Sequence, residues 1–511
     1  MSGRGAVVLV GFMGAGKTTT ARDLAALRGL RALDADQLIE ERAGTTVAEI
    51  FAGPGEAAFR ELEERVVLEL LAGAGSGDIV SLSGGAIGSA AVREALAAHI
   101  VVWLDIDPKV AWRRVGGGRR PLARDRASFE SLHAARAPIY AALADAIVPA
   151  GAREELGRAH DAVEQLRLAP PATRLLWATT GSAEYPVWIG RGLLGSGVWP
   201  LRRPPSRRFC VTDENVARHW RERAGPFDGE IVISPGERSK SVAGAERVWS
   251  ELAALGVTRA DHLVAFGGGV VGDLAGFCAA TYQRGIPVVQ VPTTLAAQVD
   301  SAYGGKTGID LPAAKNYVGA YHQPAGVLVD PATLETLPAA ELGAGYAEVL
   351  KTALIAGGAL WERIAADEPI DERTIYECVR CKLAIVAADE HDDGRRQVLN
   401  LGHTVGHALE TVTGYARYRH GEAVGLGLLA ALELSGQGAL RAQVAELLVR
   451  HGLPTHSEGV DATAVIDASR RDKKRLGSEV PFVLLDAPGA VRHGVSVEAR
   501  ALEAAVAELC R

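Results

Sequence analysis

The sequence predicts an α/β protein in three units: an α/β unit with a parallel sheet, a second α/β unit, and a mostly α-helical unit. The chain has 511 residues, more than one hydrophobic core usually organises, and typical domain sizes divide it into roughly three. Up to about Pro338, short apolar runs alternate with amphipathic stretches, the pattern of a parallel sheet covered by helices. Beyond Pro338, long Ala-, Leu- and Glu-rich stretches predict helices.

Composition and charge indicate a folded protein that acts on small molecules. Lys and Arg total 55 and Asp and Glu 62, and a net charge of −7 without a long basic run argues against nucleic acid or an anionic membrane as partner. The apolar stretch that ends at Gly11 is too short to span a membrane and lacks a small-residue cleavage site. Five cysteines, an odd number, are typical of a reducing compartment. We therefore expect a cytoplasmic protein with small-molecule substrates.

Predicted strands and a proline pair set the boundaries between the units. Consecutive prolines at Pro170 and Pro171 cannot continue a helix, so residues 169–172 are the predicted linker. The predicted units are therefore 1–168, 173–338 and 339–511. Strands are expected at residues 6–10, 79–82 and 100–104 in the first unit and at 207–212, 231–234, 262–266 and 287–291 in the second.

Residues 11–18, Gly-Phe-Met-Gly-Ala-Gly-Lys-Thr, match the phosphate-binding motif G-x-x-x-x-G-K-[ST] between a predicted strand and a predicted helix. Glycines allow backbone N–H groups to close around phosphate oxygens, Lys17 reaches the terminal phosphates, and the Thr18 hydroxyl ligates magnesium. The motif alone does not separate a kinase from a GTPase or a motor ATPase. The residues expected to bind ATP here are Gly14, Ala15, Gly16, Lys17, Thr18 and Thr19.

Three further features of the first unit point to a small anionic polyol as phosphate acceptor. Asp34 and Asp36 follow the second apolar segment, where one carboxylate is suited to orienting a hydroxyl and the other to the magnesium shell. Arg60 and Arg136 carry guanidinium groups that can grip a carboxylate with two hydrogen bonds.

With these motifs, residues 5–168 resemble shikimate kinase. The resemblance implies that Asp36, Arg60, Arg136 and the pair Gly84 and Gly85 bind shikimate, with Lys17, Asp36 and Arg120 catalytic. It also implies that Arg120 closes over the ATP phosphates on a lid hinged at residues 116–118. Ser83 departs from the family pattern, where many members carry a glycine. The alternative is a nucleotide-sensing module, against which the intact carboxylates and arginines count.

The rest of the chain contains a second, unrelated constellation. Residues 267–273 form a glycine run after a predicted strand, which lets backbone amides approach a pyrophosphate in a Rossmann-like unit. His403 and His407 lie at i and i+4 of a predicted helix, and His420 follows. With Glu348, three of these side chains supply a metal site with an open position. Spacing alone does not decide which histidine is the non-ligand.

Basic residues that gather near the glycine run and the histidines indicate an anionic substrate, one with phosphate and carboxylate groups. These residues are Lys306, Lys315, Lys351, Lys382, Arg396 and Lys474.

Residues 173–505 resemble 3-dehydroquinate synthase. The resemblance rests on residues 236–240, 267–273, 284–286, 292–294 and 304–307, on Asp300 and Glu348, and on both histidine motifs. It implies that Glu348, His403 and His420 hold zinc or cobalt. It implies NAD binding by Pro235, Gly236, Glu237, Arg238, Ser239, Lys240, Gly269, Val270, Val271, Gly272, Asp273, Thr293, Thr294, Lys306, Lys315, Thr333, Leu334, Glu335 and Thr336.

The resemblance also implies the chemistry of this second part, in which a seven-carbon keto-acid phosphate is oxidised, loses phosphate, is reduced again and closes by aldol addition. Its catalytic residues would be Lys306, Lys351 and His407, and it would act as a homodimer. The remaining substrate contacts would be Arg284, Asp300, Asn316, Lys382, Arg396, Asn400 and Lys474. The alternatives are another sugar-phosphate cyclase and a metal-dependent polyol dehydrogenase; Lys351 and Arg396 suit a carboxylated substrate and favour the synthase.

Overall fold

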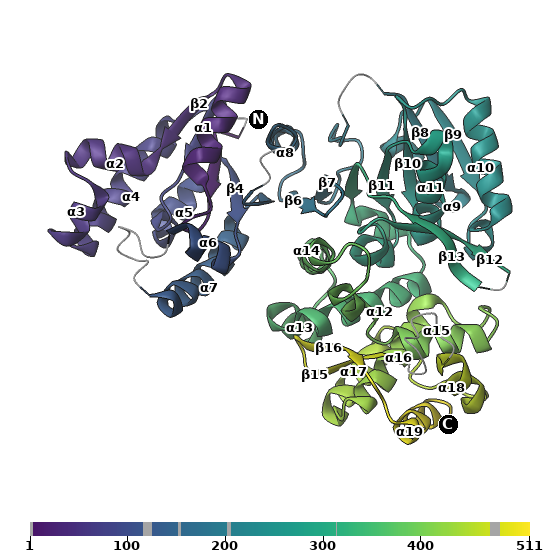
Figure 1. Cartoon of the computed structure of the whole chain (residues 1–511). Coiled ribbons are helices and arrows are strands. Elements are labelled where there is room, and N and C mark those ends of the chain that lie inside the picture. The colour runs from purple at the N-terminus through teal and green to yellow at the C-terminus, as the bar shows by residue number, and fades with distance from the viewer. Residues whose placement is uncertain (1–3, 116–124, 152–154, 202–205, 313, 471–480) are drawn as a thin grey trace. The chain divides into compact units, whose positions relative to one another are not determined.

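The computed structural model describes residues 4–115, 125–151, 155–201, 206–312, 314–470 and 481–511 (Figure 1). The chain divides into two compact units. The first comprises Met1–Ala178, Pro186–Trp188 and Ser196–Trp199, and the second Thr179–Tyr185, Ile189–Gly195 and Pro200–Arg511. The predicted three-part division with a linker at 169–172 stays a prediction.

The first unit is built on a parallel sheet, as the sequence predicts. Its strands follow the order β2-β3-β1-β4-β5-β6, and each neighbouring pair runs parallel. The strand bounds are β1 (Val7–Val10), β2 (Arg31–Asp34), β3 (Asp78–Ser81), β4 (Ile100–Asp105), β5 (Ala146–Pro149) and β6 (Arg174–Thr179). The helices are α1 (Lys17–Arg28), α2 (Ala35–Ala43), α3 (Val47–Ala52), α4 (Glu56–Gly73), α5 (Ala90–Leu96), α6 (Pro108–Val115), α7 (Arg126–Leu143) and α8 (Leu156–Glu164).

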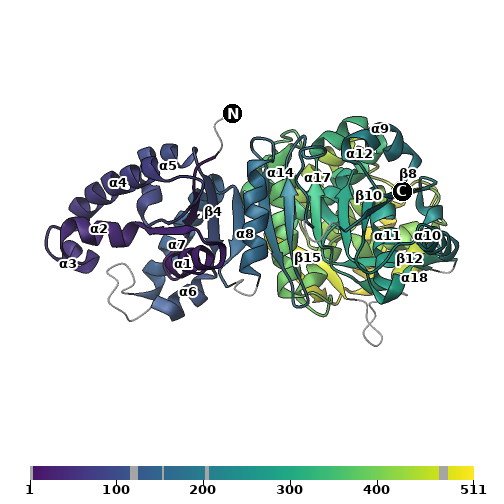
Figure 2. The ribbon, with the colours of Figure 1, turned by 90° about the horizontal axis from the view of Figure 1, so that it is seen from above.

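The central strands β1, β3 and β4 are almost wholly buried, because helices cover both faces of a parallel sheet. Helices α2, α3 and α4 group at one end of the unit (Figure 2) around a separate core of Ile39, Ile50, Phe59 and Val66. Since parallel strands end at the same edge, the residues that follow β1, β2 and β3 meet there. These are the phosphate-binding loop, Ala35–Asp36 and Leu82–Gly85.

The second unit opens with a run of parallel strands in the order β14-β11-β10-β8-β9. Helices α10 and α11 pack on it through a core that includes Val248, Leu252, Leu274 and Phe277. The strands are β8 (Arg208–Asp213), β9 (Gly229–Ile233), β10 (His262–Gly267), β11 (Val288–Pro292) and β14 (Gly326–Val329), and the helices α9 (Glu214–Ala224), α10 (Val242–Ala254) and α11 (Gly269–Thr281). Strand β7 (Glu184–Ile189) is divided between the two units.

An antiparallel hairpin of β12 (Lys306–Leu311) and β13 (Ala314–Tyr321) was not expected from the sequence. Strand β13 is mostly exposed, so it shows none of the apolar runs that revealed the other strands. Gly319 faces the partner strand so closely that a Cβ there would lie 2.3 Å from the Thr307 carbonyl oxygen. The hairpin brings Lys306, Lys315 and Asn316 together on one element.

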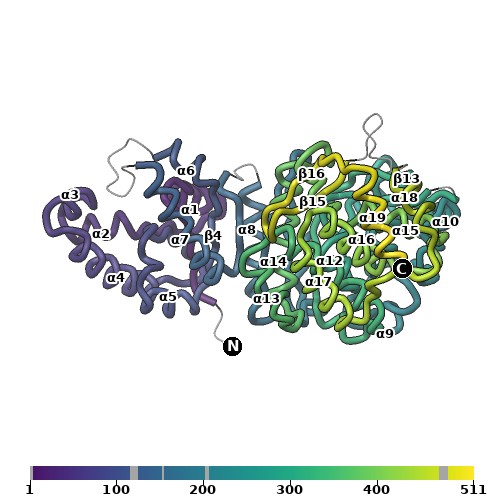
Figure 3. Tube along the Cα trace, turned by 90° about the horizontal axis from the view of Figure 1, so that it is seen from below, coloured from purple at the N-terminus to yellow at the C-terminus, as the bar shows by residue number. Residues whose placement is uncertain are grey.

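The last part is mostly helical, as the sequence predicts, and α16 passes through its middle in contact with α12, α15, α17 and α19 (Figure 3). The described helices include none long and apolar enough to cross a membrane. The helices are α12 (Ala339–Ala356), α13 (Gly358–Ala365), α14 (Glu372–Ala388), α15 (His403–Val412), α16 (His420–Leu434), α17 (Gly438–Arg450), α18 (Ala462–Arg470) and α19 (Ala499–Leu509), with one hairpin, β15 (Phe482–Ala487) and β16 (Ala490–Val495).

Glycines allow α15 and α16 to approach closely. A Cβ on Gly427 of α16 would lie only 1.8 Å from the carbonyl oxygen of Gly402, the N-cap of α15. Gly421 lets the start of α16 contact α12 in the same way, because its Cβ would lie 1.8 Å from the Ala344 carbonyl oxygen. These contacts set the positions of His403 and His420, which begin α15 and α16.

We predict that Gly427→Ala pushes α15 away from α16 and lowers the free energy of unfolding of the second unit by about 1–3 kcal/mol, the usual cost of overpacking. The atom in the way is backbone and cannot swing aside. Denaturant unfolding, monitored by hydrogen exchange in α15 and α16, measures this loss of free energy. Gly438→Ala, at an exposed helix start with no atom within 4 Å of its Cβ, is the control and should lose no stability. Equal behaviour of the two variants would contradict the packing described.

Candidate functional site

The phosphate-binding loop of the first unit joins β1 to α1 through backbone that only glycine adopts easily. Gly14 and Gly16 have φ of 83° and 85°, in the left-handed region. The Lys17 ammonium folds over the loop and donates to the carbonyl oxygens of Gly11 at 2.8 Å and Phe12 at 3.4 Å. The Thr18 hydroxyl lies 3.4 Å from the Ser81 hydroxyl. Both side chains thus stand at the carboxyl edge of the sheet, where a triphosphate and its magnesium would lie.

Two arginines converge on the glycine pair at the same edge. The Arg60 guanidinium, from α4, packs directly over Gly85, where a Cβ would lie 1.9 Å from Nη1. Arg136, from α7, donates through Nη1 to the Gly84 carbonyl oxygen at 3.0 Å. A Cβ on Gly84 would also lie 3.9 Å from the Lys17 ammonium. The structure therefore brings Lys17, Arg60 and Arg136 to one glycine turn, an arrangement that suits an anionic acceptor beside the phosphates.

The aspartates of this edge begin α2. Asp34 is the N-cap and its carboxylate accepts from the Gln37 backbone N–H at 3.2 Å, while Asp36 lies in the first helical turn with its side chain exposed. Arg120 and residues 116–118, the expected lid and hinge, lie outside the described residues.

Residues that the sequence did not reveal hold this edge in place. Glu63 is buried, its Oε2 lies 2.6 Å from Arg60 Nη1, and it accepts a hydrogen bond from the Ser83 hydroxyl. Tyr140 donates to the Gly84 carbonyl oxygen at 2.8 Å, and burial raises the pKa of its hydroxyl to about 12. Glu63 lies one helical turn after Arg60, and this spacing could have predicted that the two side chains pair. The contacts of Ser83 and Tyr140 join residues far apart in the sequence, so the sequence alone could not predict them.

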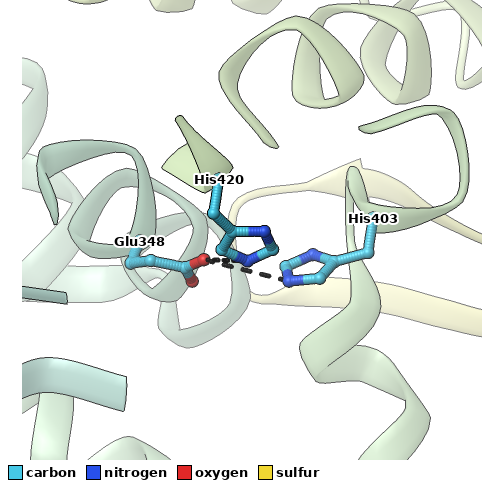
Figure 4. Close-up of side chains that lie close together, drawn as sticks. All are labelled: Glu348, His403 and His420. Carbon is cyan, nitrogen blue, oxygen red and sulfur yellow. Dashed lines mark ion pairs between the residues drawn. The ribbon is translucent and has the colours of Figure 1, made fainter. Parts of the chain in front are cut away.

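In the second unit, a cavity of about 1960 Å³ is lined by both the α/β part and the helical part. Glu348 of α12, His403 of α15 and His420 of α16 meet in its wall, with their ligand atoms all within 4.8 Å of one another (Figure 4). Glu348 Oε1 lies 3.4 Å from His420 Nε2 and 3.8 Å from His403 Nε2. One carboxylate and two imidazoles are a donor set that Zn²⁺ and Co²⁺ accept, so these residues fit the implied metal.

Buried charged groups surround these three residues. Lys351 Nζ lies 2.5 Å from Glu348 Oε2 and 3.3 Å from Asp300 Oδ1, and Lys382 Nζ lies 2.9 Å from Asp300 Oδ2. Burial alone would raise the pKa of Asp300, but the two ammonium groups lower it to about 2. Burial lowers the pKa of Lys382 to about 8, against the opposing effect of Asp300. The cavity wall therefore presents positive charge held in place by carboxylates.

The hairpin and a neighbouring loop complete this wall. Lys306 Nζ lies 2.5 Å from Asp392 Oδ2. The buried Arg396 donates through Nη2 to the Gly304 carbonyl oxygen at 3.0 Å. Asn316, Asn400 and His407 also line the cavity.

Both units match models of known protein families. Residues 13–167 match the family model of shikimate kinase, and residues 230–344 and 345–475 match those of the 3-dehydroquinate synthase N-terminal and C-terminal parts. The 3-dehydroquinate synthase of Symbiobacterium thermophilum is 44% identical over 336 residues, which cover 61% of this chain and 94% of that protein. This chain belongs to the 3-dehydroquinate synthase family. A shikimate kinase domain precedes its synthase part.

Solved structures of other cyclases share the fold of the synthase part. The 2-epi-5-epi-valiolone synthase of Streptomyces hygroscopicus subsp. jinggangensis, with NAD⁺ and Zn²⁺ bound, is 25% identical with a TM-score of 0.59, covering 65% of this chain and 98% of that chain. A 2-deoxy-scyllo-inosose synthase in complex with carbaglucose-6-phosphate, NAD⁺ and Co²⁺ shares the fold at 24% identity and a TM-score of 0.58, covering 65% and 99%. The predictions of fold class and of a two-enzyme chain are confirmed.

Most residues expected at the nucleotide end of the synthase part do line the cavity. Gly268 packs so closely against Thr294 that a Cβ would lie 2.8 Å from its methyl group, so a larger residue would displace Thr294. The expected residues found in the lining are Pro235, Gly236, Glu237, Lys240, Gly269, Val270, Val271, Asp273, Thr293, Thr294, Lys306, Lys315, Thr333 and Thr336.

Other expected residues lie elsewhere in the described part of the chain. Gly272 faces the Gln290 side chain, Glu335 pairs with Arg191, and the Ser239 hydroxyl donates to the Ser234 carbonyl oxygen at 2.6 Å. Arg238, Leu334 and Arg284 are likewise not in the described lining. Lys474 lies outside the described residues. The ligand contacts expected of all these residues stay predictions.

We predict that Ser83→Ala lowers the free energy of unfolding of the kinase domain by about 1–3 kcal/mol, because the buried Glu63 loses a donor. A less firmly held Arg60 should also raise the KM for shikimate. Hydrogen exchange of the β1 amides and initial-rate kinetics measure the two effects. Ser76→Ala, in an exposed turn, is the control and should stay within about 0.5 kcal/mol. Unchanged stability and KM in Ser83→Ala would show that the hydroxyl supports neither residue.

Proposed function

We propose that the chain catalyses two separate reactions of aromatic amino acid biosynthesis. The kinase domain transfers the γ-phosphate of ATP to shikimate, giving shikimate 3-phosphate. The synthase part converts 3-deoxy-D-arabino-heptulosonate 7-phosphate to 3-dehydroquinate with release of phosphate. The observation that carries the second assignment is the meeting of Glu348, His403 and His420 beside buried lysines, in a cavity that also contains the glycine run.

In the kinase domain, the chain positions two anions. Lys17 releases the loop carbonyl oxygens and turns to the ATP phosphates, with magnesium held by Thr18. Arg60 and Arg136 hold the shikimate carboxylate at the glycine pair, and Asp36 accepts from its hydroxyl groups. Transfer then requires the acceptor oxygen to lie in line with the γ-phosphorus while positive charge stabilises the transferred group. No covalent enzyme intermediate is needed.

In the synthase part, Glu348, His403 and His420 would hold a divalent zinc or cobalt ion, and the glycine run and hairpin would hold NAD. When bound, NAD takes up and returns a hydride at the substrate C5, and the metal polarises the oxygen on that carbon. The chain itself binds and orients the substrate. Lys351, Lys382 and Arg396 hold its carboxylate and hydroxyl groups, and Lys306, Asn316 and His407 hold its phosphate. The reaction has no net oxidation, so NAD is not consumed.

The carboxylated substrate separates this function from that of the related cyclases. Lys351 and Lys382 are buried ammonium groups fixed by Asp300, a site that suits a carboxylate better than a neutral hydroxyl. We also propose that the protein is cytoplasmic, since its five cysteines are free, and that it forms a homodimer through the synthase part.

A phosphate-release assay with the heptulosonate phosphate, Co²⁺ or Zn²⁺ and substoichiometric NAD tests the synthase. We expect many phosphates released per NAD and no accumulation of NADH. Stoichiometric NADH would indicate a polyol dehydrogenase, and release only from a substrate without the carboxylate would indicate another cyclase.

We predict that Lys17→Met lowers shikimate-dependent ADP formation by about a hundredfold or more, because the transferred phosphate loses its nearest cation. Phosphate release by the synthase part should not change. Both activities are measured on the same preparation, and the matched control is Lys109→Met, an exposed lysine in the first turn of α6. Loss of both activities in a folded Lys17→Met protein would contradict two independent enzymes.

The synthase should lose affinity for its substrate as the pH rises through about 8, the pKa of the buried Lys382, because the neutral amine no longer attracts an anion. Below that pH the ammonium is charged and KM should be at its lowest. In Lys382→Gln we expect a KM that lies above the wild-type value below pH 8, approaches it at higher pH, and shows no such dependence of its own. A wild-type KM that stays constant from pH 7 to about 9.5 would rule out a substrate contact by Lys382.

A further inference from the structure

Glu410 is a buried carboxylate that none of the expected metal or substrate contacts includes. It lies on α15, one turn after His407 and two turns after His403, so all three side chains share one face of the helix. Its side chain is only 3% exposed, yet it borders the cavity. A buried carboxylate of this kind needs partners, and it has two: His420 and Lys315.

His420 stands between two carboxylates. Its Nε2 lies 3.4 Å from Glu348 Oε1, and its Nδ1 lies 3.4 Å from Glu410 Oε2. A neutral imidazole carries one N–H and one free lone pair. When Nδ1–H donates to Glu410, the lone pair of Nε2 points toward Glu348 and His403, the side that fits a metal. Glu410 thus selects the ring orientation and the tautomer that binding requires.

Lys315 connects Glu410 to the nucleotide end of the cavity. Its Nζ lies 3.4 Å from Glu410 Oε1 and 3.8 Å from Glu237 Oε1, and it stacks over the Tyr415 ring at 4.7 Å. Glu237 in turn lies 3.7 Å from the Lys240 ammonium, which pairs with Asp273 of α11 at 2.6 Å. Charges of alternating sign therefore run from α11 to Glu410, which contacts the expected metal ligand His420. The charged groups are, in order, Asp273, Lys240, Glu237, Lys315 and Glu410.

We propose that Glu410 is a positioning residue for the metal site and that Lys315 couples it to the nucleotide-binding end, so that NAD and the metal bind cooperatively. The coupling rests on the proposed NAD site, whereas the positioning role does not. A ligand that moves Glu237 or Lys315 changes the charge that faces Glu410, and through it the hold on His420. By linkage, the metal must then favour NAD to the same extent.

A second metal is the competing use of these residues, because ligand atoms of His407, Glu410 and His420 also lie within 4.8 Å of one another. Two observations favour the positioning role. The Lys315 ammonium already neutralises Glu410 and would repel a cation beside it. His420 would also have to bridge two ions through both ring nitrogens.

The test is the affinity of the full-length protein for Co²⁺, measured by competition with a chelator and by the visible spectrum of the bound ion. We expect Glu410→Gln to raise the metal Kd by about 10–100-fold, the usual effect of removing an outer carboxylate partner. Glu433→Gln, a carboxylate change on the same helix as His420, is the matched control and should leave Kd unchanged. If Glu410→Gln does not fold, Glu410→Asp replaces it, with a smaller rise in Kd.

An unchanged Kd in Glu410→Gln, or two Co²⁺ ions per wild-type chain with one lost in the variant, would overturn the positioning role. The coupling is measured as the ratio of metal Kd values without and with saturating NAD. We expect a ratio of about five or more in the wild type and near one in Lys315→Met. A wild-type ratio of one would overturn the coupling. None of these readouts uses turnover, so they stand apart from a failure of the phosphate-release assay.

Discussion

The second unit depends on a buried ion pair between Glu348 and Lys351, one turn apart on α12. Removing two charges from water is costly, and such a pair persists only when further partners satisfy it. Asp300 provides one for Lys351, and Lys382 then balances Asp300. The charged groups of this cavity wall are therefore paired with one another. An anion that enters the cavity would meet ammonium groups already fixed by carboxylates.

The kinase domain uses the same principle with fewer groups. Buried Glu63 holds Arg60 over Gly85, while Arg136 and Tyr140 fix the Gly84 carbonyl oxygen. In both units, glycines stand where another group packs directly against the backbone. The Arg60 guanidinium packs against Gly85, and the start of α15 packs against Gly427. The absence of a Cβ at these positions is what lets charged or helical elements approach.

Sequence reasoning succeeded where the chemistry is local in the chain. The phosphate-binding loop and the pair His403 and His407 are contiguous patterns, and the apolar runs of the parallel sheets mark buried strands. Glu410 was open to the same reasoning, since it continues the helix face of those histidines. The β12–β13 hairpin was not, because an exposed strand has no apolar pattern.

Long-range pairings form the part that sequence could not supply. Nothing in the spacing of Ser83 and Glu63, or of Lys315 and Glu410, says that the side chains meet. The resemblance to known families implied a set of metal ligands and substrate contacts, but it did not explain Ser83. In this chain the Ser83 hydroxyl donates a hydrogen bond to Glu63, a contact that a glycine at this position could not make.

The hydrogen bonds from Lys17 to the Gly11 and Phe12 carbonyl oxygens have a kinetic consequence. They tie the loop to itself through atoms of this chain alone, so binding a nucleotide should cost little chain entropy in the loop. The ammonium has only to exchange carbonyl oxygens for phosphate oxygens, a swap of acceptors without refolding. We therefore expect ordering of this loop to contribute little to the barrier for nucleotide binding.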